Sequence, residues 1–148
     1  MVKLAQEYFT EYAKKDPNKL AVDVWHEEKS DRKAKGIKYA KDALEMSFGQ
    51  LEEYSNQLAR YLKKADVRKG DRVALMFMKI FSVDAIASIL AILKCDAIYV
   101  PISHTLPVER VIKILNDSGA KLITCDPLSS KELIKHITNF QFIELNYI

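Results

Sequence analysis

The sequence predicts an α/β protein with a mostly parallel sheet and helices on both faces. From residue 72 onward, short apolar runs of strand length alternate with longer segments of helical periodicity. The run 72–78 is apolar almost without interruption, which is typical of a strand covered on both faces. Strands that alternate with helices are joined by right-handed crossovers, which place the strands parallel in one sheet. The 148 residues, 49% of them hydrophobic, suffice for one compact domain.

The first 25 residues predict an amphipathic helix followed by a strand. Four large apolar side chains recur at helical spacing: Leu4, Tyr8, Phe9 and Tyr12. The turn residues Asp16-Pro17-Asn18 end this helix. Residues 20–25 then have the apolar character of a strand.

A second helix is predicted over residues 47–64. Residues 46–48 form a short strand or the entry to this helix. Ser47 and Gln50 have capping-box spacing, in which each side chain accepts a hydrogen bond from the backbone N–H of the other. The expected buried stripe consists of Leu51, Tyr54, Leu58 and Leu62.

Alternating strands and helices follow the turn Lys69-Gly70-Asp71. We expect strands at 72–78, 97–102, 121–125 and 141–145, and helices at 82–94, 107–118 and 129–138. The helix 82–94 is apolar almost all round and should be buried between layers, and 97–102 should be a buried strand. Gly119 suits the C-terminal stop of the middle helix. Ser129 and Glu132 have the spacing of a capping box that opens the last helix.

Residues 27–43 form a highly charged insert with Gly36 near its middle. Its composition predicts a surface loop or an extended hairpin tip, and it is the segment where we expect local disorder. The chain as a whole has an ordinary charged fraction of 29% and a net charge of +3. Its lysines are scattered among acids, and Lys14-Lys15 and Lys63-Lys64 fall near predicted helix ends, where cations suit the helix dipole. No basic stripe interleaves with aromatic residues, so we expect no nucleic-acid partner.

The N-terminus turns polar too soon for a signal peptide, and the longest apolar stretch, 85–93, is too short to span a bilayer. We therefore expect a cytoplasmic protein without a membrane span. The two cysteines, Cys95 and Cys125, fit no zinc pattern, and their apolar surroundings predict buried free thiols. The three histidines fall on different predicted elements without carboxylates at metal-binding spacing: His26, His104 and His136.

Three positions invite a functional interpretation, each beside a structural one. His104 follows the C-terminal end of a strand, which is where open sheets bind ligands. It is therefore either a substrate or nucleotide contact, or part of a polar loop that caps the next helix. We favour the polar loop. Asp84 is either a perturbed carboxylate or, as we favour, a first-turn residue that faces the helix dipole. Glu109-Arg110 either binds an anion or forms an exposed helix face, which we favour.

Phosphate-binding loops require glycines close together, because backbone amides must approach the phosphate without side chains in between. The four glycines of this chain are scattered: Gly36, Gly49, Gly70 and Gly119. The turn 79–82 after the first buried strand is bulky and apolar. We therefore assign no catalytic residue, no cofactor-binding residue and no metal ligand from the residues alone.

Five runs of the sequence form a pattern, in this order: Met46-Ser47-Phe48-Gly49-Gln50-Leu51, the helix residues 55–62, Val67-Arg68-Lys69-Gly70-Asp71-Arg72-Val73-Ala74-Leu75, the run 87–101 that ends in Ala97-Ile98-Tyr99-Val100-Pro101, and the pair Leu106-Pro107-Val108-Glu109-Arg110 and Asp117-Ser118-Gly119-Ala120-Lys121. In this order they resemble the N-terminal segment of the adenylate-forming superfamily, which includes acyl-CoA synthetases, luciferases and nonribosomal peptide synthetase adenylation domains. The last two runs are most similar to amino-acid-activating adenylation domains. Membership among the acyl-CoA synthetases is the alternative.

The chain departs from the family pattern at several positions. Asp96 stands where the family usually has glycine, and Asp66 where a glycine usually precedes the valine. Ser103 replaces a frequent aspartate or asparagine, and the insert 27–43 is longer than in most relatives. Where the backbone is left-handed, each aspartate costs about 1 kcal/mol relative to glycine.

The resemblance implies that the complete enzyme joins a carboxylic acid to AMP, using ATP and Mg²⁺, and passes the acyl group to a thiol of coenzyme A or of a carrier protein. In the family, the phosphate loop, the adenine and ribose contacts and the catalytic lysine follow this stretch. We therefore expect residues 1–148 to be the N-terminal portion of an AMP-binding (adenylation) domain that binds no cofactor alone. Its expected partner is the remainder of that domain or a complementary chain.

Two alternatives stay open. In the first alternative, the chain is a truncated relative that acts as an interaction or docking module or forms a homodimer. The contacts would come from apolar residues near its end: Phe142, Ile143, Leu145, Tyr147 and Ile148. In the second, it is a small α/β ligand-binding protein unrelated to the family, an interpretation that the order of the five runs disfavours.

Overall fold

The computed structural model describes residues 3–23, 45–78 and 82–145. Its main sheet has four parallel strands: β3 (Arg72–Met76), β4 (Ile98–Pro101), β5 (Ala120–Cys125) and β6 (Gln141–Glu144). The strand order is β4-β3-β5-β6, so β3 and β5 are central and β4 and β6 are the edges. The predicted α/β fold with a parallel sheet is therefore confirmed.

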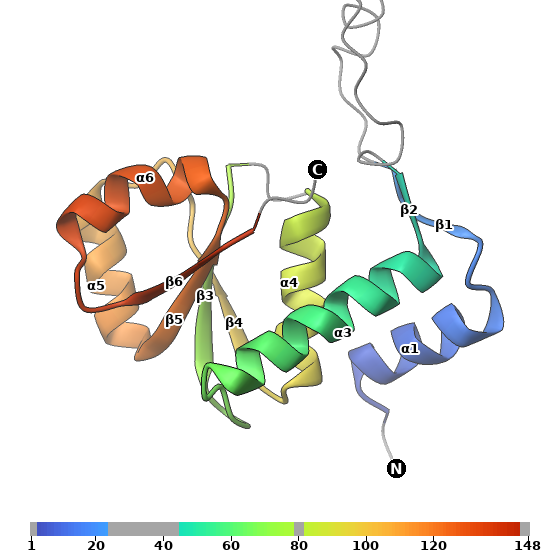
Figure 1. Ribbon diagram of the computed structural model, residues 1–148. Coiled ribbons are helices and arrows are strands. Elements are labelled where there is room, and N and C mark those ends of the chain that lie inside the picture. Colours follow the sequence, from blue (N-terminus) through green and yellow to red (C-terminus); the bar gives the residue numbers. More distant parts are fainter. Residues whose placement is uncertain (1–2, 24–44, 79–81, 146–148) are drawn as a thin grey trace, which may run out of the picture.

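Helices cover both faces of this sheet (Figure 1). One face carries α3 (Phe48–Lys64) and α4 (Val83–Lys94), and the other carries α5 (Val108–Ser118) and α6 (Pro127–His136). Because strand side chains alternate, β3 and its extension supply both cores. Val73, Leu75 and Phe77 pack with α3 and α4, whereas Ala74 and Met76 pack with α5 and α6.

The prediction that 97–102 is a buried strand is wrong, because β4 lies at the edge of the sheet. Ile98 is 52% exposed and Tyr99 39% exposed, although β4 pairs with β3 along its length. An apolar strand covered on both faces and an apolar edge strand have the same composition. Only the strand order, which is a tertiary property, separates them.

The N-terminal elements form a smaller unit beside α3 (Figure 1). The helix α1 (Ala5–Lys15) precedes an antiparallel pair, β1 (Leu20–Asp23) and β2 (Glu45–Ser47). A third cluster joins this pair to α3 and α4, and its buried members are Val22, Met46, Leu51, Val83 and Ala87. The predicted apolar face of α1 is only partly correct. Leu4 and Tyr8 are exposed, whereas the rings of Phe9 and Tyr12 pack against Phe48 in a tilted arrangement. The predicted insert 27–43 lies outside the described residues, as does His26.

The signals for helix ends were confirmed at α3 and wrong at α6. The amide of Gln50 donates to Ser47 Oγ (3.2 Å), and the amide of Ser47 donates to Gln50 Oε1 (2.9 Å). At α6, however, the N-cap is Asp126, whose Oδ1 accepts from the amide of Ser129 (2.8 Å). The helix therefore begins at Pro127, before the predicted capping box.

Four described residues have left-handed backbone: Asp66, Gly70, Asp96 and Gly119. Asp66 (φ 64°) and Asp96 (φ 53°) adopt the conformation that glycine provides at less cost, as the family pattern predicted. Gly119 (φ 62°) ends α5 as predicted, and a Cβ there would lie 2.9 Å from a terminal nitrogen of Arg72. That arginine donates from Nε to the carbonyl of Ser118 (2.7 Å), which caps the end of α5. Among the described residues, no helix is long and apolar enough to cross a membrane.

Candidate functional site at the carboxyl end of the sheet

The topology defines one crevice between neighbouring strands. The chain leaves β3 toward α4 on one face of the sheet and leaves β5 toward α6 on the other face. In open parallel sheets, ligands bind where adjacent strands send their connections in opposite directions, outside the carboxyl ends of the strands. A ligand-binding site is therefore expected at the carboxyl ends of β3 and β5.

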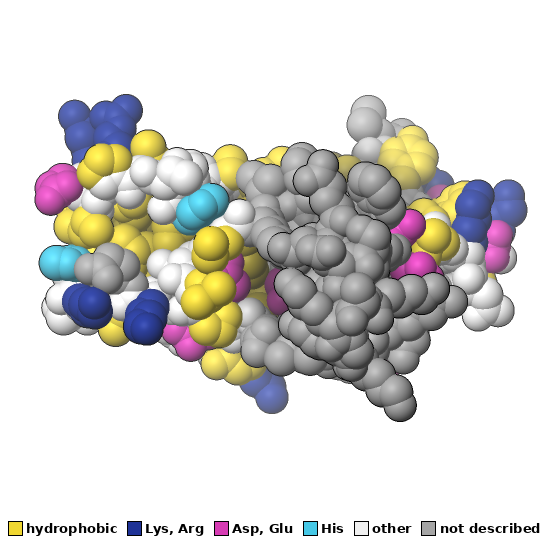
Figure 2. Space-filling model, turned by 90° about the horizontal axis from the view of Figure 1, so that it is seen from above, with side chains coloured by type: hydrophobic (Ala, Val, Ile, Leu, Met, Phe, Trp, Pro, Cys, Tyr) yellow, Lys and Arg dark blue, Asp and Glu magenta, His cyan; other side chains and the backbone are white. Residues whose placement is uncertain are grey.

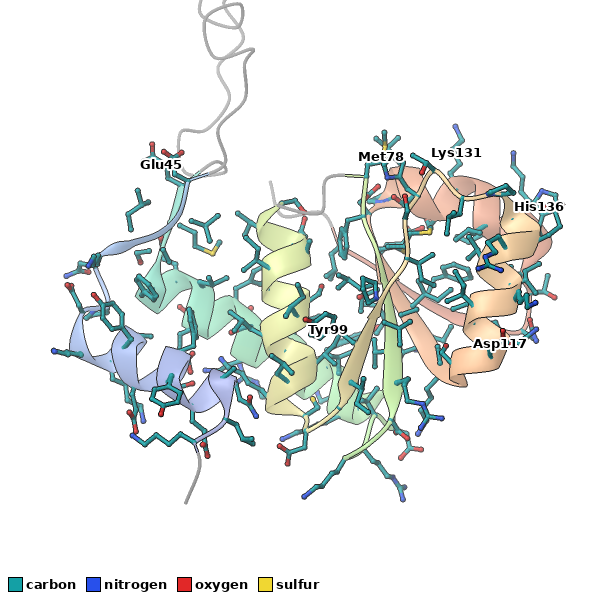
Figure 3. The ribbon with its side chains drawn as sticks, turned by 180° about the vertical axis from the view of Figure 1, so that it is seen from behind. Glu45, Met78, Tyr99, Asp117, Lys131 and His136 are labelled. Carbon is teal, nitrogen blue, oxygen red and sulfur yellow. The ribbon has the colours of Figure 1, made fainter. Side chains whose placement is uncertain are left out.

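A cavity of about 350 Å³ lies there. It is lined by Met78, Ser82, Asp84, Asp126, Pro127, Leu128 and Leu145. Met78 stands at this end of β3 in Figure 3, and Figure 2 looks down on the same end, where hydrophobic side chains gather over the sheet beside the grey atoms. Met78 and Leu128 are both exposed, so the mouth of the crevice is largely apolar.

Asp126 fixes the geometry of the crevice. Its Oδ2 accepts from the amide of Met78 (2.6 Å) and from the hydroxyl of Ser129 (2.9 Å), while Oδ1 caps α6. One carboxylate thus ties the end of β3 to the start of α6. Because its oxygens accept three hydrogen bonds from the protein, its role is positional.

Asp84 lies in the first turn of α4, whose N-cap is Ser82, and accepts a hydrogen bond from the hydroxyl of Tyr54 (2.5 Å). The favoured interpretation, a carboxylate that faces the helix dipole, is confirmed. This bond also joins α3 to the start of α4, so the second carboxylate of the crevice is held in place as well.

His104 lines a neighbouring hollow of about 230 Å³ on the other side of Met78, with Phe77 and Pro101 in its wall. The prediction that its loop caps α5 is wrong, because the hydroxyls of Ser103 and Thr105 bind each other (2.8 Å) and the N-cap, Pro107, has no side-chain bond. The structure therefore places His104 at the carboxyl end of the sheet, exposed and beside a hollow. Glu109 and Arg110 are both exposed on α5, as favoured.

Cys125 ends β5 just below this site, and both cysteines are buried free thiols, as predicted. Burial, with the nearby charges of Glu144 and Asp126, raises the pKa of the Cys125 thiol to about 12. Glu144 accepts a short hydrogen bond from Ser130, which fixes α6 to β6. Cys125 is therefore a core residue and not a nucleophile at neutral pH.

The residues of the crevice do not fit the phosphates of a nucleotide. Its two charged lining residues are carboxylates, and no lysine or arginine is among its described lining residues. A triphosphate would meet like charge there. In the described part of the chain, no group of three or more His, Cys, Asp or Glu residues could hold a metal ion. We therefore derive no phosphoryl chemistry from these residues.

A buried polar network, which sequence reasoning missed, holds the helices that carry the crevice. Lys94 at the end of α4 is only 10% exposed, and its Nζ donates to Glu52 (2.8 Å), Ser55 (2.7 Å) and Asn56 (2.9 Å) on α3. Thr10 of α1 donates to the same glutamate (3.0 Å). Burial raises the pKa of Glu52, but hydrogen bonds and the charge of Lys94 outweigh that effect and hold this pKa below its usual value. A lysine that ends an otherwise apolar helix was the available signal.

The fold and this site define an α/β scaffold with a ligand crevice at a topological switch point. The sequence model described as AMP-binding enzyme matches residues 9–144. The chain therefore belongs to the family of AMP-binding enzymes, which confirms the resemblance found in its sequence.

Peptide synthetases are similar in sequence to this chain. It is 34% identical over 122 residues to the nonribosomal peptide synthetase NPS2 of Ceriporiopsis subvermispora (strain B), covering 82% of the chain and 5% of that protein. It is 31% identical over 140 residues to gramicidin S synthase 1 of Brevibacillus brevis, covering 95% of the chain and 11% of that protein. The chain thus spans about a tenth or less of the length of these relatives.

Solved structures share the fold. The alpha-methyl-L-serine-AMP bound form of the nonribosomal peptide synthetase FmoA3 superimposes with a TM-score of 0.77 at 22% identity, over 96% of this chain and 14% of that one. The N-terminal domain of FACL13 from Mycobacterium tuberculosis gives 0.75 at 23% identity, over 99% and 34%. The predicted likeness to the N-terminal subdomain of the adenylate-forming fold is confirmed.

Proposed function

We propose that this chain is the N-terminal part of an ATP-dependent ligase that activates a carboxylic acid as its adenylate and then transfers it to a thiol. The observation that carries the proposal is the family match over residues 9–144, together with a structure that superimposes on adenylate-forming enzymes. The two relatives described above are peptide synthetases, which favours an amino acid as the substrate of the complete protein.

The chain contributes scaffold and one wall of the site. Asp126 and the Tyr54–Asp84 bond hold the ends of β3, α4 and α6 at the crevice. The cationic and metal-binding groups that neutralise a triphosphate come, in this proposal, from further polypeptide, because the crevice supplies carboxylates. The 148-residue chain alone is then inactive.

The experiment is to isolate the native product with an antibody against this chain, determine its size and measure acid-dependent exchange of pyrophosphate into ATP. The substrates are the proteinogenic amino acids and a set of fatty and aryl acids. We expect a longer polypeptide that exchanges with an amino acid. A longer product that exchanges with no acid would overturn the proposal. Calorimetric binding of ATP–Mg²⁺ to the 148-residue chain would contradict the assignment of the phosphate contacts to further polypeptide.

A docking module is the second candidate, and the exposed apolar residues Ile98 and Tyr99 on the edge strand β4 favour it. The residues of β6 favour it less than the sequence suggested, because Ile143 is buried and Phe142 half-buried. A native product of this chain's own length, without exchange activity, would select this candidate.

A further inference from the structure

A groove outside the crevice has an excess of positive charge. It has a volume of about 270 Å³ and lies between α1, α3 and α4, and it is lined by Thr10, Glu52, Asn56, Ala59, Arg60, Lys63 and Lys94. Three cations there face one carboxylate. Its volume is just under the range of pockets that hold drug-sized ligands, so it suits a smaller one.

The floor of the groove is rigid and close to neutral. Lys94 directs its hydrogen bonds to Glu52, Ser55 and Asn56, and Glu52 is itself only 17% exposed. The charge of Lys94 is therefore balanced by its partner. The excess charge comes from Arg60 and Lys63 at the rim.

Within residues 3–23, 45–78 and 82–145, the side chains of Arg60 and Lys63 form no ion pair and no hydrogen bond. The basic residues at the nearby turn differ, because Arg68 pairs with Asp66, and Lys121 pairs with Asp66 and Asp71. Two like charges three residues apart on one helix repel each other by about 0.2–0.5 kcal/mol. An anion between them would remove that cost.

We propose that this groove binds the phosphate group of a small phosphate monoester. Arg60 offers the planar fork that matches phosphate oxygens, Lys63 adds a point charge on the same face of α3, and Thr10 and Asn56 line the groove beside them. The site lies on the outer side of α3 and is separate from the crevice, so it does not depend on the ligase proposal.

The test is a chemical-shift titration of the ¹⁵N-labelled 148-residue chain with glycerol phosphate and with inorganic phosphate. We expect saturable shifts confined to the amides of α3 and of the end of α4. The double substitution Arg60→Gln with Lys63→Gln should weaken binding at least about tenfold. The matched control is Lys14→Gln with Lys15→Gln, which removes the same charge from the exposed end of α1 and should change binding less than about twofold.

Equal losses in the two double variants would show general attraction by net charge and overturn the proposal, as would shifts that fail to saturate. Tighter binding of the monoester supports the proposal. Tighter binding of inorganic phosphate would overturn the choice of an esterified ligand. Both pairs of residues are exposed, and a thermal melt of each variant checks that it is folded.

Discussion

Replacing Asp96 by glycine should stabilise the protein. Asp96 follows the end of α4 with φ of 53°, a conformation that costs an L-residue about 1–2 kcal/mol. Its carboxylate also lies near the negative end of the helix dipole. Both of its backbone bonds survive the substitution, because the amide donates to Leu93 (3.0 Å) and the carbonyl accepts from Gly70 (2.9 Å).

The gain in stability is smaller than the strain energy that is relieved. Glycine makes the unfolded chain more flexible, which costs about 0.4–1 kcal/mol of conformational entropy on folding. We expect a net increase of about 0.5–1 kcal/mol in the free energy of unfolding, and a Tm higher by about 1–4 °C for a chain of this length. Urea denaturation followed by circular dichroism measures the first quantity, and a thermal melt measures the second.

Two further variants identify the cause. Asp96→Ala removes the charge but keeps a side chain at positive φ, so it should gain less than Asp96→Gly. Glu53→Gly places a glycine at an exposed site inside α3 and should cost about 1 kcal/mol. Equal stability of Asp96→Gly and Asp96→Ala would refute the argument from backbone strain, and a less stable Asp96→Gly would refute it outright.

Three other predictions concern the buried interior. Ser88→Ala should raise the free energy of unfolding by about 1 kcal/mol, because the buried Ser88 hydroxyl has no partner among the described residues. Ser55→Ala should lower the free energy of unfolding by about 1 kcal/mol, because the Ser55 hydroxyl accepts a hydrogen bond from Lys94. Chemical denaturation of both variants measures the two changes. Cys125 should react with a thiol reagent at pH 8 only as fast as the protein unfolds, and labelling at the rate of a free thiol would contradict its burial. Glu52→Gln should lower stability by about 1–3 kcal/mol at pH 7. The folded pKa of Glu52 is below its unfolded value, so its contribution is present above the unfolded pKa and is lost as the pH falls through the folded one. Denaturation at pH 7 and pH 3 should thus show a difference between parent and variant that shrinks in acid, and a constant difference would refute the ion-pair account.

Local signals in the sequence were sufficient for most of the scaffold. The alternation of strands and helices and the capping box of Ser47 and Gln50 depend on residues close together in the chain. Each was confirmed because neighbouring backbone and side chains decide it. The α6 cap was wrong for the opposite reason. Asp126 competes with Ser129 for the role, and the amide of Met78, far away in sequence, adds a bond that only the folded sheet supplies.

The candidate site was harder to predict than the fold. The crevice exists because β3 lies between β4 and β5 in the sheet, so that β3 and β5 are neighbours. No single segment of the sequence encodes this strand order. The Lys94 network likewise needs three helices to meet. Each member is an ordinary polar residue in the sequence. The one available signal, which was missed, is Lys94 at the end of an apolar helix, where a buried charge needs partners.

The strand order also has a consequence for the route of folding. The register pairs Met76 with Cys125, so the centre of the sheet closes only after the chain has passed through α4, β4 and α5. On a ribosome, β3 emerges with β4 as its first available neighbour and gains its second neighbour much later. Such non-local pairing must overcome loop-closure entropy before its contacts are gained, which slows folding. The Asp126 bond to Met78 can form only after this closure, so it should belong to the last stage of assembly, where its loss would speed unfolding more than it slows folding.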